Sequence, residues 1–258
     1  MEFISGGVCA PKGFKCAGVH CGIRKNKSKK DLALIVSEKI ANAAAVYTTN
    51  LVKGAPLVVT KKNLANGKAQ AMICNSGNAN TCNANGIEIA EGMCGLVSKH
   101  LEIDKNDVIV ASTGVIGQPL SIEPIEKGMP ELVKKLGDNS FDASCAIMTT
   151  DTVRKEVAVS FRIGDAECRI GGIAKGSGMI HPNMATLLVF LTTDTLISAE
   201  LLREAISEDV RDTFNMVSVD GDTSTNDMLS IMANGLAQNK EITEKGEDYE
   251  TFKKALNL

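Results

Sequence analysis

Thr186 stands at the junction of a glycine-containing loop and an apolar segment, where a side chain could do nucleophilic chemistry. The loop begins with Lys175-Gly176-Ser177-Gly178, whose glycines free the backbone and expose N–H groups. The segment 187–191 that follows is continuously apolar and is typical of a buried strand. A hydroxyl at this junction would be held rigidly and would stay reachable, as a nucleophile must.

Activation of the Thr186 hydroxyl requires a base, because a threonine hydroxyl is a poor nucleophile on its own. Cleavage of the peptide bond between Ala185 and Thr186 would supply one, since the freed α-amine of Thr186 can take the proton from its own hydroxyl. Ala185 is small and unbranched, so it leaves the carbonyl of that bond open to attack. An ordinary β-branched residue at the start of a strand is the alternative that these residues leave open.

Two other segments fail the tests for better-known sites. The segment 220–227 begins like an EF-hand calcium loop, but Thr225 stands where glycine is needed and Ile231 where a bidentate glutamate is needed. We expect a hydrogen-bonded turn there, capping a helix that opens at 228–233. The segment 171–178 has the composition of a phosphate-binding loop without its Gly-x-x-x-x-Gly-Lys-Ser/Thr register. Calcium binding and nucleotide hydrolysis are therefore disfavoured.

The histidines and cysteines form no recognisable metal site or catalytic triad. Cys16, His20 and Cys21 cluster in the sequence but lack a second ligand pair at a structural-zinc spacing. None of the 3 histidines has serine and aspartate partners in a known order. The 8 cysteines are spread over 258 residues, so we expect buried free thiols in place of disulfides. We expect no metal and no tightly bound cofactor.

Composition and charge exclude several classes of protein. The net charge is -3 and the sequence pI is about 5.7, which gives no basic footprint for nucleic acid. No apolar run is long enough to cross a membrane, so we expect a cytoplasmic protein without membrane contact. With 44% hydrophobic and 23% charged residues the chain has a globular composition, and with 3% aromatic residues its core must be mainly aliphatic.

Periodic patterns predict the elements that would position these residues. Alternation of apolar and polar residues over 157–163 predicts a hairpin with 168–173, and Ser198 is the expected N-cap of a helix. Spacings of three and four predict another helix with an inward stripe of Ile87, Ala90, Cys94, Val97 and Leu101. Further strands are expected at 32–36, 44–47, 57–60, 69–74 and 108–111. Interleaved strands and helices predict a mixed α/β fold.

Two of the predicted strands run directly into polar, glycine-containing turns. The strand at 69–74 leads into the segment 75–80, and the strand at 108–111 leads into 112–117. Turns of this kind can present N–H groups to an anion. The basic cluster at 24–30 is expected to be a solvated hairpin loop.

Seven separated motifs, in order along the chain, resemble the glutamate N-acetyltransferase (ornithine acetyltransferase) family of arginine biosynthesis. They are Gly6-Gly7-Val8 with Ala10-Pro11-Lys12-Gly13-Phe14, Thr48-Thr49-Asn50, Asn75-Ser76-Gly77-Asn78-Ala79-Asn80, Ser112-Thr113-Gly114-Val115-Ile116-Gly117, Met148-Thr149-Thr150-Asp151-Thr152, the segment 174–186, and the segment 219–227. The resemblance implies a layered αββα sandwich, similar to but topologically distinct from the N-terminal-nucleophile hydrolases.

The resemblance also implies a self-cleaving enzyme. The precursor would be cut between Ala185 and Thr186 into chains 1–185 and 186–258, which stay associated as a heterotetramer of two chains of each kind. Thr186 would take the acetyl group from N-acetylornithine and pass it to glutamate. Whether acetyl-CoA also serves as a donor is left open.

The matching motifs imply roles for individual residues. Thr113 and Gly114 would form the oxyanion hole, while Thr149, Lys175 and Thr186 would contact the substrate. A strand-ending Ser-Thr-Gly turn offers donors to an oxyanion, and a lysine offers a cation to a carboxylate, so the residue types suit these roles.

The resemblance further implies that family members continue into a later acidic substrate-binding motif and a C-terminal segment that closes the site. This chain stops at Leu258 without them, so we expect a truncated form of the enzyme. Two alternatives stay open at this point. One is a self-processing hydrolase that uses water as the acyl acceptor, and the other is an inactive fragment of the acetyltransferase.

Overall fold

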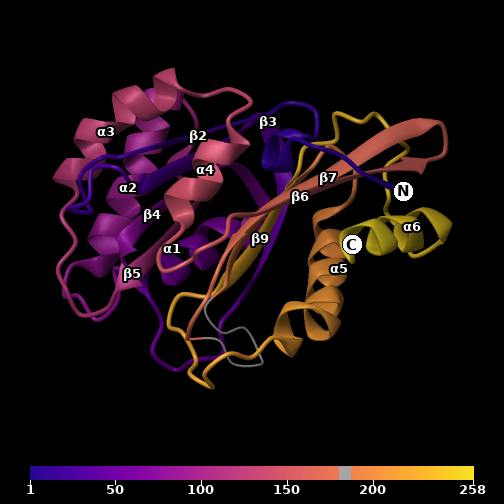
Figure 1. Cartoon of the computed structure of the whole chain (residues 1–258). Helices are drawn as coiled ribbons and strands as arrows, with labels where there is room; N and C mark the ends of the chain where they lie inside the picture. The colour runs from indigo at the N-terminus through magenta and orange to yellow at the C-terminus, as the bar shows by residue number, and fades with distance from the viewer. Residues whose placement is uncertain (180–186) are drawn as a thin grey trace.

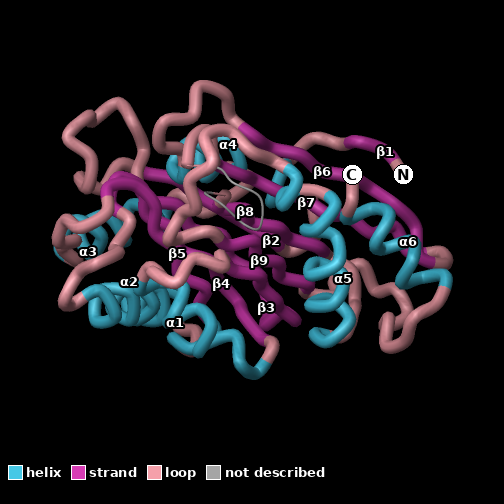
Figure 2. Tube along the Cα trace, turned by 90° about the horizontal axis from the view of Figure 1, so that it is seen from below, coloured by secondary structure: helices cyan, strands magenta, loops and turns pink. Residues whose placement is uncertain are grey.

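A computed structural model describes residues 1–179 and 187–258, and its centre is a nine-stranded sheet with the order β1-β6-β7-β8-β9-β3-β4-β5, in which β2 also pairs with β3 (Figures 1 and 2). The strands are β1 (Glu2–Phe3), β2 (Phe14–Val19), β3 (Leu32–Tyr47), β4 (Lys68–Asn78), β5 (Val108–Val115), β6 (Lys155–Ile163), β7 (Ala166–Lys175), β8 (Leu188–Thr193) and β9 (Met228–Ala233). The helices are α1 (Ala55–Asn63), α2 (Gly86–Leu101), α3 (Glu123–Lys134), α4 (Ser140–Ile147), α5 (Ala199–Asp212) and α6 (Glu247–Leu256).

The long strand β3 joins two halves of the sheet. One half contains β2, β4 and β5, and the other contains β1, β6, β7, β8 and β9. The first part of β3 pairs with β2 on one side and with β4 on the other, and its last part, 42–47, pairs with β9. The pairing with β4 is irregular between Val36 and Ala41, where the strand passes from one half to the other. An irregularity of this kind bends a strand and increases its twist. The two halves can therefore fold over one another without a break in the chain.

Three buried clusters show that the molecule is layered. The middle cluster contains Ile35 and Met72 from one half of the sheet together with Phe190 and Met232 from the other, so it is the core between the halves. A second cluster packs α2 and α3 against the outer face of β2 to β5. The third packs α5 and α6 against the outer face of β6 to β9. Figure 1 shows the two helical layers on opposite sides of the strands. The predicted layered sandwich is confirmed.

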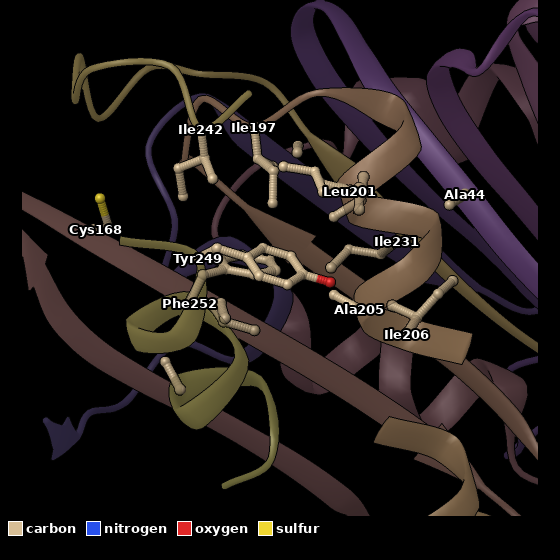
Figure 3. Packing of buried hydrophobic residues seen from close by; sticks show 14 of the residues in the cluster. Ala44, Cys168, Ile197, Leu201, Ala205, Ile206, Ile231, Ile242, Tyr249 and Phe252 are labelled. Atoms are coloured by element: carbon tan, nitrogen blue, oxygen red, sulfur yellow. The ribbon is translucent and has the colours of Figure 1, made fainter. Parts of the chain in front are cut away.

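The outer core beside α5 and α6 combines aliphatic side chains with the aromatic rings of α6 (Figure 3). Tyr249 and Phe252 from α6 are fully buried and pack with Leu201 from α5 and Ile231 from β9. The ring of Phe252 meets that of Phe161 edge to face, with 6.3 Å between centroids. Edge-to-face pairs of this kind add to the free energy gained from burial. The sheet edge that carries β6 and β7 is thereby fixed to both helices.

Several expected elements are confirmed. Strands β6 and β7 form the predicted hairpin, with Phe161 opposite Cys168. Ser198 caps α5 by accepting a hydrogen bond from the N–H of Leu201 at 3.3 Å. None of the helices in the described part of the chain is long and apolar enough to span a bilayer.

Three expectations are wrong. Residues 57–60 lie in helix α1, which has Pro56 in its first turn and Lys61 and Lys62 in its last, so the short apolar run is not a strand. Residues 228–233 form strand β9 and not a helix. Both faces of this strand are buried, so its residues are apolar apart from Ser230 and show no alternation. The stripe expected on α2 is wrong at Ile87, which is 42% exposed. It is right at Ala90, Cys94 and Val97, while Leu101 is partly buried and Ile89 and Met93 complete the buried face.

Candidate functional site

A cavity of about 540 Å³ lies where the ends of β4, β5 and β7 meet three loops. Four residues expected at the site, Thr113, Gly114, Thr149 and Lys175, all line it. The remaining lining residues are Arg24, Gly77, Ala79, Val115, Ile116, Thr150, Gly178, Met179, Asp220, Asp222, Ser224, Thr225 and Asn226. The two expected residues Ala185 and Thr186 lie outside the described residues. Met179, the last described residue before that gap, is part of the cavity wall.

The wall formed by β4 and β5 depends on two glycines that face each other. The strands are parallel, and Gly77 is the register partner of Gly114. Gly114 has φ +132°, and a Cβ placed there would lie 2.3 Å from the carbonyl carbon of Gly77. Only glycine fits such a close approach of two backbones at a positive φ. The two turns predicted to present N–H groups are therefore brought together in one wall.

Lys175 and Thr113 meet across the cavity. Lys175 ends β7, is only 3% exposed, and donates from Nζ to the Thr113 hydroxyl at 3.3 Å. Burial lowers the pKa of Lys175, and the nearby carboxylates of Asp151 and Asp227 oppose that effect. The result is a buried cationic donor beside a hydroxyl, a pair suited to binding an anionic oxygen.

Asp151 fixes the two loops that carry Thr149 and Lys175. Its carboxylate accepts hydrogen bonds from the backbone N–H of Gly176 at 2.8 Å and of Thr149 at 3.1 Å. It also pairs with Lys155 at 2.8 Å. Burial opposes ionisation of Asp151, but these hydrogen bonds outweigh it and hold the pKa of the carboxyl below its usual range. A charged Asp151 therefore fastens the end of β7 to the loop after α4.

Arg24 is a site residue that the sequence did not reveal. The basic cluster was expected to be a solvated loop, and residues 25–29 are indeed exposed. Arg24 instead turns inward, donates to the carbonyl of Met148 and lines the cavity. Burial lowers its pKa, although Asp31 and Asp151 oppose the shift. The only sequence signal is its place at the inner end of the cluster, beside the glycine-containing segment.

The segment 220–227 closes the cavity, and the side chain of Asn226 fixes it. This amide donates to the carbonyl of Ala79 at 2.7 Å and to that of Ser112 at 2.9 Å. Its oxygen accepts from the Thr81 hydroxyl at 2.6 Å. One buried side chain thus ties together the loop after β4, strand β5 and the approach to β9. The expected hydrogen-bonded turn is confirmed, but it leads into a strand.

The arrangement is suited to a small anionic substrate. Two partly desolvated cations, Lys175 and Arg24, line the cavity together with the Thr113 hydroxyl. Asp220 and Asp222 lie on the loop that closes it. Among the described residues, no group of three or more His, Cys, Asp and Glu side chains could hold a metal ion. The cations and the hydroxyl that line the cavity can supply charge recognition and oxyanion stabilisation.

The sequence profile of the ArgJ family matches residues 15–258. The arginine biosynthesis bifunctional protein ArgJ of Caldanaerobacter subterraneus subsp. tengcongensis is 49% identical over 258 residues. That alignment covers 99% of this chain and 64% of the relative. The chain thus spans slightly less than two thirds of the length of the curated relatives it matches.

Solved structures give the same family. The arginine biosynthesis bifunctional protein ArgJ of Bacillus halodurans matches with a TM-score of 0.67 and 40% identity, covering 71% of this chain and 97% of that one. Ornithine acetyltransferase of Mycobacterium tuberculosis, solved with ornithine, matches with a TM-score of 0.65 and 35% identity, covering 72% and 99%. An aminopeptidase of Ochrobactrum anthropi, described as a variant of the Ntn hydrolase fold, matches at 10% identity with a TM-score of 0.61 and shares the fold alone.

Proposed function

This chain belongs to the ArgJ family, and from that premise we propose that it carries the nucleophile and oxyanion hole of an acetyltransferase of arginine biosynthesis. In this proposal the acetyl group passes from N-acetylornithine to glutamate through an ester on Thr186. The observation that carries the proposal is the single cavity that unites Thr113, Gly114, Thr149 and Lys175 next to Met179, where the chain enters the segment containing Thr186.

The proposed reaction has two halves. The Thr186 hydroxyl attacks the acetyl carbonyl of N-acetylornithine, and its own α-amine takes the proton and passes it to the leaving amine, so ornithine departs. The free amine of glutamate then attacks acetyl-Thr186, and N-acetylglutamate leaves as the hydroxyl is restored. Each half passes through an oxyanion, for which Thr113 and the backbone of Gly114 are the proposed donors.

The proposal includes cleavage between Ala185 and Thr186, which gives Thr186 the α-amine that the mechanism needs. The share of this chain that the two solved relatives match supports this cleavage. Residues 1–185 are 185 of 258, or about 72% of this chain. The two solved relatives match 71% and 72% of this chain while 97% and 99% of their own length is matched. Chains of that length are what a cut at this position would leave on the N-terminal side.

Substrate recognition is assigned to charges on two sides of the cavity. Lys175 and Arg24 are the proposed partners of substrate carboxylates, because both cations line the cavity and are partly desolvated. The carboxylate of Asp222 on the closing loop is the proposed partner of the side-chain amine of ornithine. The solved ornithine acetyltransferase of Mycobacterium tuberculosis was crystallised with ornithine, which suits a site of this charge pattern.

The test compares the wild-type protein with its Thr186→Ala and Thr186→Ser variants. Intact mass should show two fragments for the wild type and for the serine variant, with the second fragment beginning at residue 186, and one uncut chain for the alanine variant. Acetyl transfer from N-acetylornithine to glutamate should follow the same pattern. An uncut wild-type protein, or an alanine variant that keeps its transferase activity, contradicts the proposal.

The same assay separates the remaining possibilities. Loss of N-acetylornithine that does not depend on glutamate identifies a hydrolase, because water is then the acceptor. Acetyl-CoA offered in place of N-acetylornithine tests it as a second donor. Activity of the purified 258-residue chain decides whether this form is catalytic or an inactive fragment. We further propose that the cleaved chains assemble as two of each kind in the cytoplasm, which sedimentation of the purified protein and cell fractionation can check.

A further inference from the structure

Cys9 and Cys16 form a close pair of thiols away from the cavity. Their sulfur atoms are 3.1 Å apart. Cys9 ends the short 3₁₀ helix η1 (Gly7–Cys9), and Cys16 lies in β2. Neither residue lines the cavity, and all 8 cysteines are free. The pair therefore needs an explanation that the proposed acetyl transfer does not give.

The backbone holds both cysteines in place. The N–H of Cys16 donates to the carbonyl of Gly137 at 2.9 Å, and the N–H of Gly137 donates back to the carbonyl of Cys16 at 3.2 Å. On the other side, Val8 donates to the Ser140 hydroxyl at 3.3 Å and accepts from the Thr192 hydroxyl at 2.8 Å. Helix η1 is thus fixed between α4 and β8, and the two sulfurs are brought together by the fold and not by a flexible terminus.

The two thiols differ in access and in acidity. Cys9 is partly exposed, whereas Cys16 is completely buried. A hydrogen bond from the Cys16 thiol lowers the pKa of Cys9, against the opposing effects of burial and of Asp138. The same hydrogen bond and burial raise the pKa of Cys16. A partly exposed thiol whose pKa is lowered, next to a buried thiol, is the arrangement of an attacking and a resolving cysteine.

We propose that Cys9 and Cys16 are a redox-active dithiol site, which small-molecule disulfides such as glutathione disulfide convert to an intramolecular disulfide. The Cys9 thiolate attacks one sulfur of the oxidant, forming a mixed disulfide and releasing the first thiolate. Cys16 then gives up its proton and attacks the sulfur of Cys9, which releases the second thiol. The two cysteines are oxidised by two electrons, and the oxidant is reduced to two thiols.

The disulfide would join β2 of one half of the sheet to helix η1, which packs against the other half. Gly171 of β7 shows how close that packing is, because a Cβ placed there would lie 1.8 Å from the carbonyl oxygen of Gly7. Oxidation would therefore cross-link segments that the fold already holds together. The inference rests on the closeness and the different access of these two thiols and does not depend on the proposed acetyl transfer.

In the test, the native full chain is incubated with glutathione disulfide, and the remaining thiols are then blocked with iodoacetamide. The blocked chain is digested with trypsin. Cleavage after Lys12, Lys15 and Arg24 places Cys9 and Cys16 in different peptides, 1–12 and 16–24. We expect these two peptides to be joined. The intact chain, weighed before iodoacetamide is added, should be lighter by two hydrogen atoms. Because peptide 16–24 also contains Cys21, the Cys21→Ser variant is the matched control and should keep the link.

The single-cysteine variants complete the test. Cys16→Ser should stop at a glutathione adduct on Cys9, and Cys9→Ser should give neither the adduct nor the link. A wild-type chain that keeps glutathione on Cys9 without closing the disulfide overturns the proposal. So does a link that is lost in Cys21→Ser, or reaction confined to the exposed Cys82. The wild-type result decides even if a serine variant fails to fold.

Discussion

The Nζ atom of Lys175 donates to the Oγ1 atom of Thr113 at 3.3 Å, joining the end of β7 to the end of β5. The two strands lie in different halves of the sheet, so this contact is made only when both halves are folded over one another. A cation and a hydroxyl proposed to act on the same substrate are thus positioned by the tertiary fold as a unit.

The first prediction concerns the charge on Lys175. We expect Lys175→Met to lower kcat/KM about 10–100-fold, since it removes a charged hydrogen-bond donor from the site. Because burial lowers the pKa of Lys175, the wild-type rate should fall as the pH rises through that lowered pKa, where the ammonium is lost. The Lys175→Met variant should not show this fall in rate at high pH. Equal pH–rate profiles for the two proteins would argue against a charged role for Lys175.

The second prediction concerns the Thr113 hydroxyl. Thr113→Ala should slow acetyl transfer about 10²–10³-fold if the hydroxyl donates to the oxyanion, the scale measured for other oxyanion-hole donors. Thr113→Ser keeps the hydroxyl and is the matched control, so it should retain most of the rate. An unchanged rate in the alanine variant would assign the stabilisation to backbone N–H groups alone. Single-turnover measurements separate this effect from substrate binding.

The third prediction compares two glycines in the same turn. Gly114→Ala should destabilise the protein by more than about 3 kcal/mol, because its Cβ would collide with the backbone of Gly77. Gly117 also has a positive φ of +77°, but no described atom lies within 4 Å of a Cβ placed there. Gly117→Ala should therefore cost only the left-handed backbone penalty of about 1–2 kcal/mol. Urea unfolding measures both, and equal costs would contradict the close approach.

The fourth prediction concerns Asp151 and acid. Its pKa in the folded state lies below the unfolded value of about 3.9. Its contribution to stability is therefore present above about pH 4 and is lost as the pH falls through the folded-state pKa. Asp151→Asn should cost about 1–3 kcal/mol near pH 7, because the amide cannot replace all the charged hydrogen bonds. The difference from wild type should shrink in acid, and a gap independent of pH would refute the assignment.

The fifth prediction concerns Arg24. Arg24→Met should raise the KM for a carboxylate substrate about 10-fold, the expected cost of one charged hydrogen bond. Lys25 lies next to it in the sequence but is exposed, so Lys25→Met is the matched control and should leave KM unchanged. A similar rise in both variants would mean that only the general charge of the loop matters, and higher salt would then abolish the difference.

Local patterns predicted elements well where one strong signal was present. Alternation over 157–163 marked the hairpin, and Ser198 before an apolar stripe marked the start of α5. The pattern was misleading where tertiary packing determined whether a segment forms a strand or a helix. Residues 228–233 are buried on both faces, so they lack the alternation of a strand. Residues 57–60 form a short apolar run inside a helix, and such runs fit either element.

The candidate site was predictable in part. The order of motifs pointed to Thr113, Gly114, Thr149 and Lys175, which the fold brings into one cavity. The inward turn of Arg24 was not predictable, because a basic run in a loop is usually solvated. The contact between the sulfurs of Cys9 and Cys16 likewise depends on the packing of η1, which no local pattern encodes.

The place of β8 in the sheet has a consequence for a chain cut before it. Strand β8 is hydrogen-bonded to β7 on one side and to β9 on the other, and β9 in turn pairs with β3. A break between Ala185 and Thr186 would assign β3 and β7 to one polypeptide and β8 and β9 to the other, interleaved within one sheet. The two pieces could separate only if the hydrogen bonds between β7 and β8 and those between β3 and β9 were broken. The cut would thus create two new chain ends, at Ala185 and Thr186, without creating a new domain boundary.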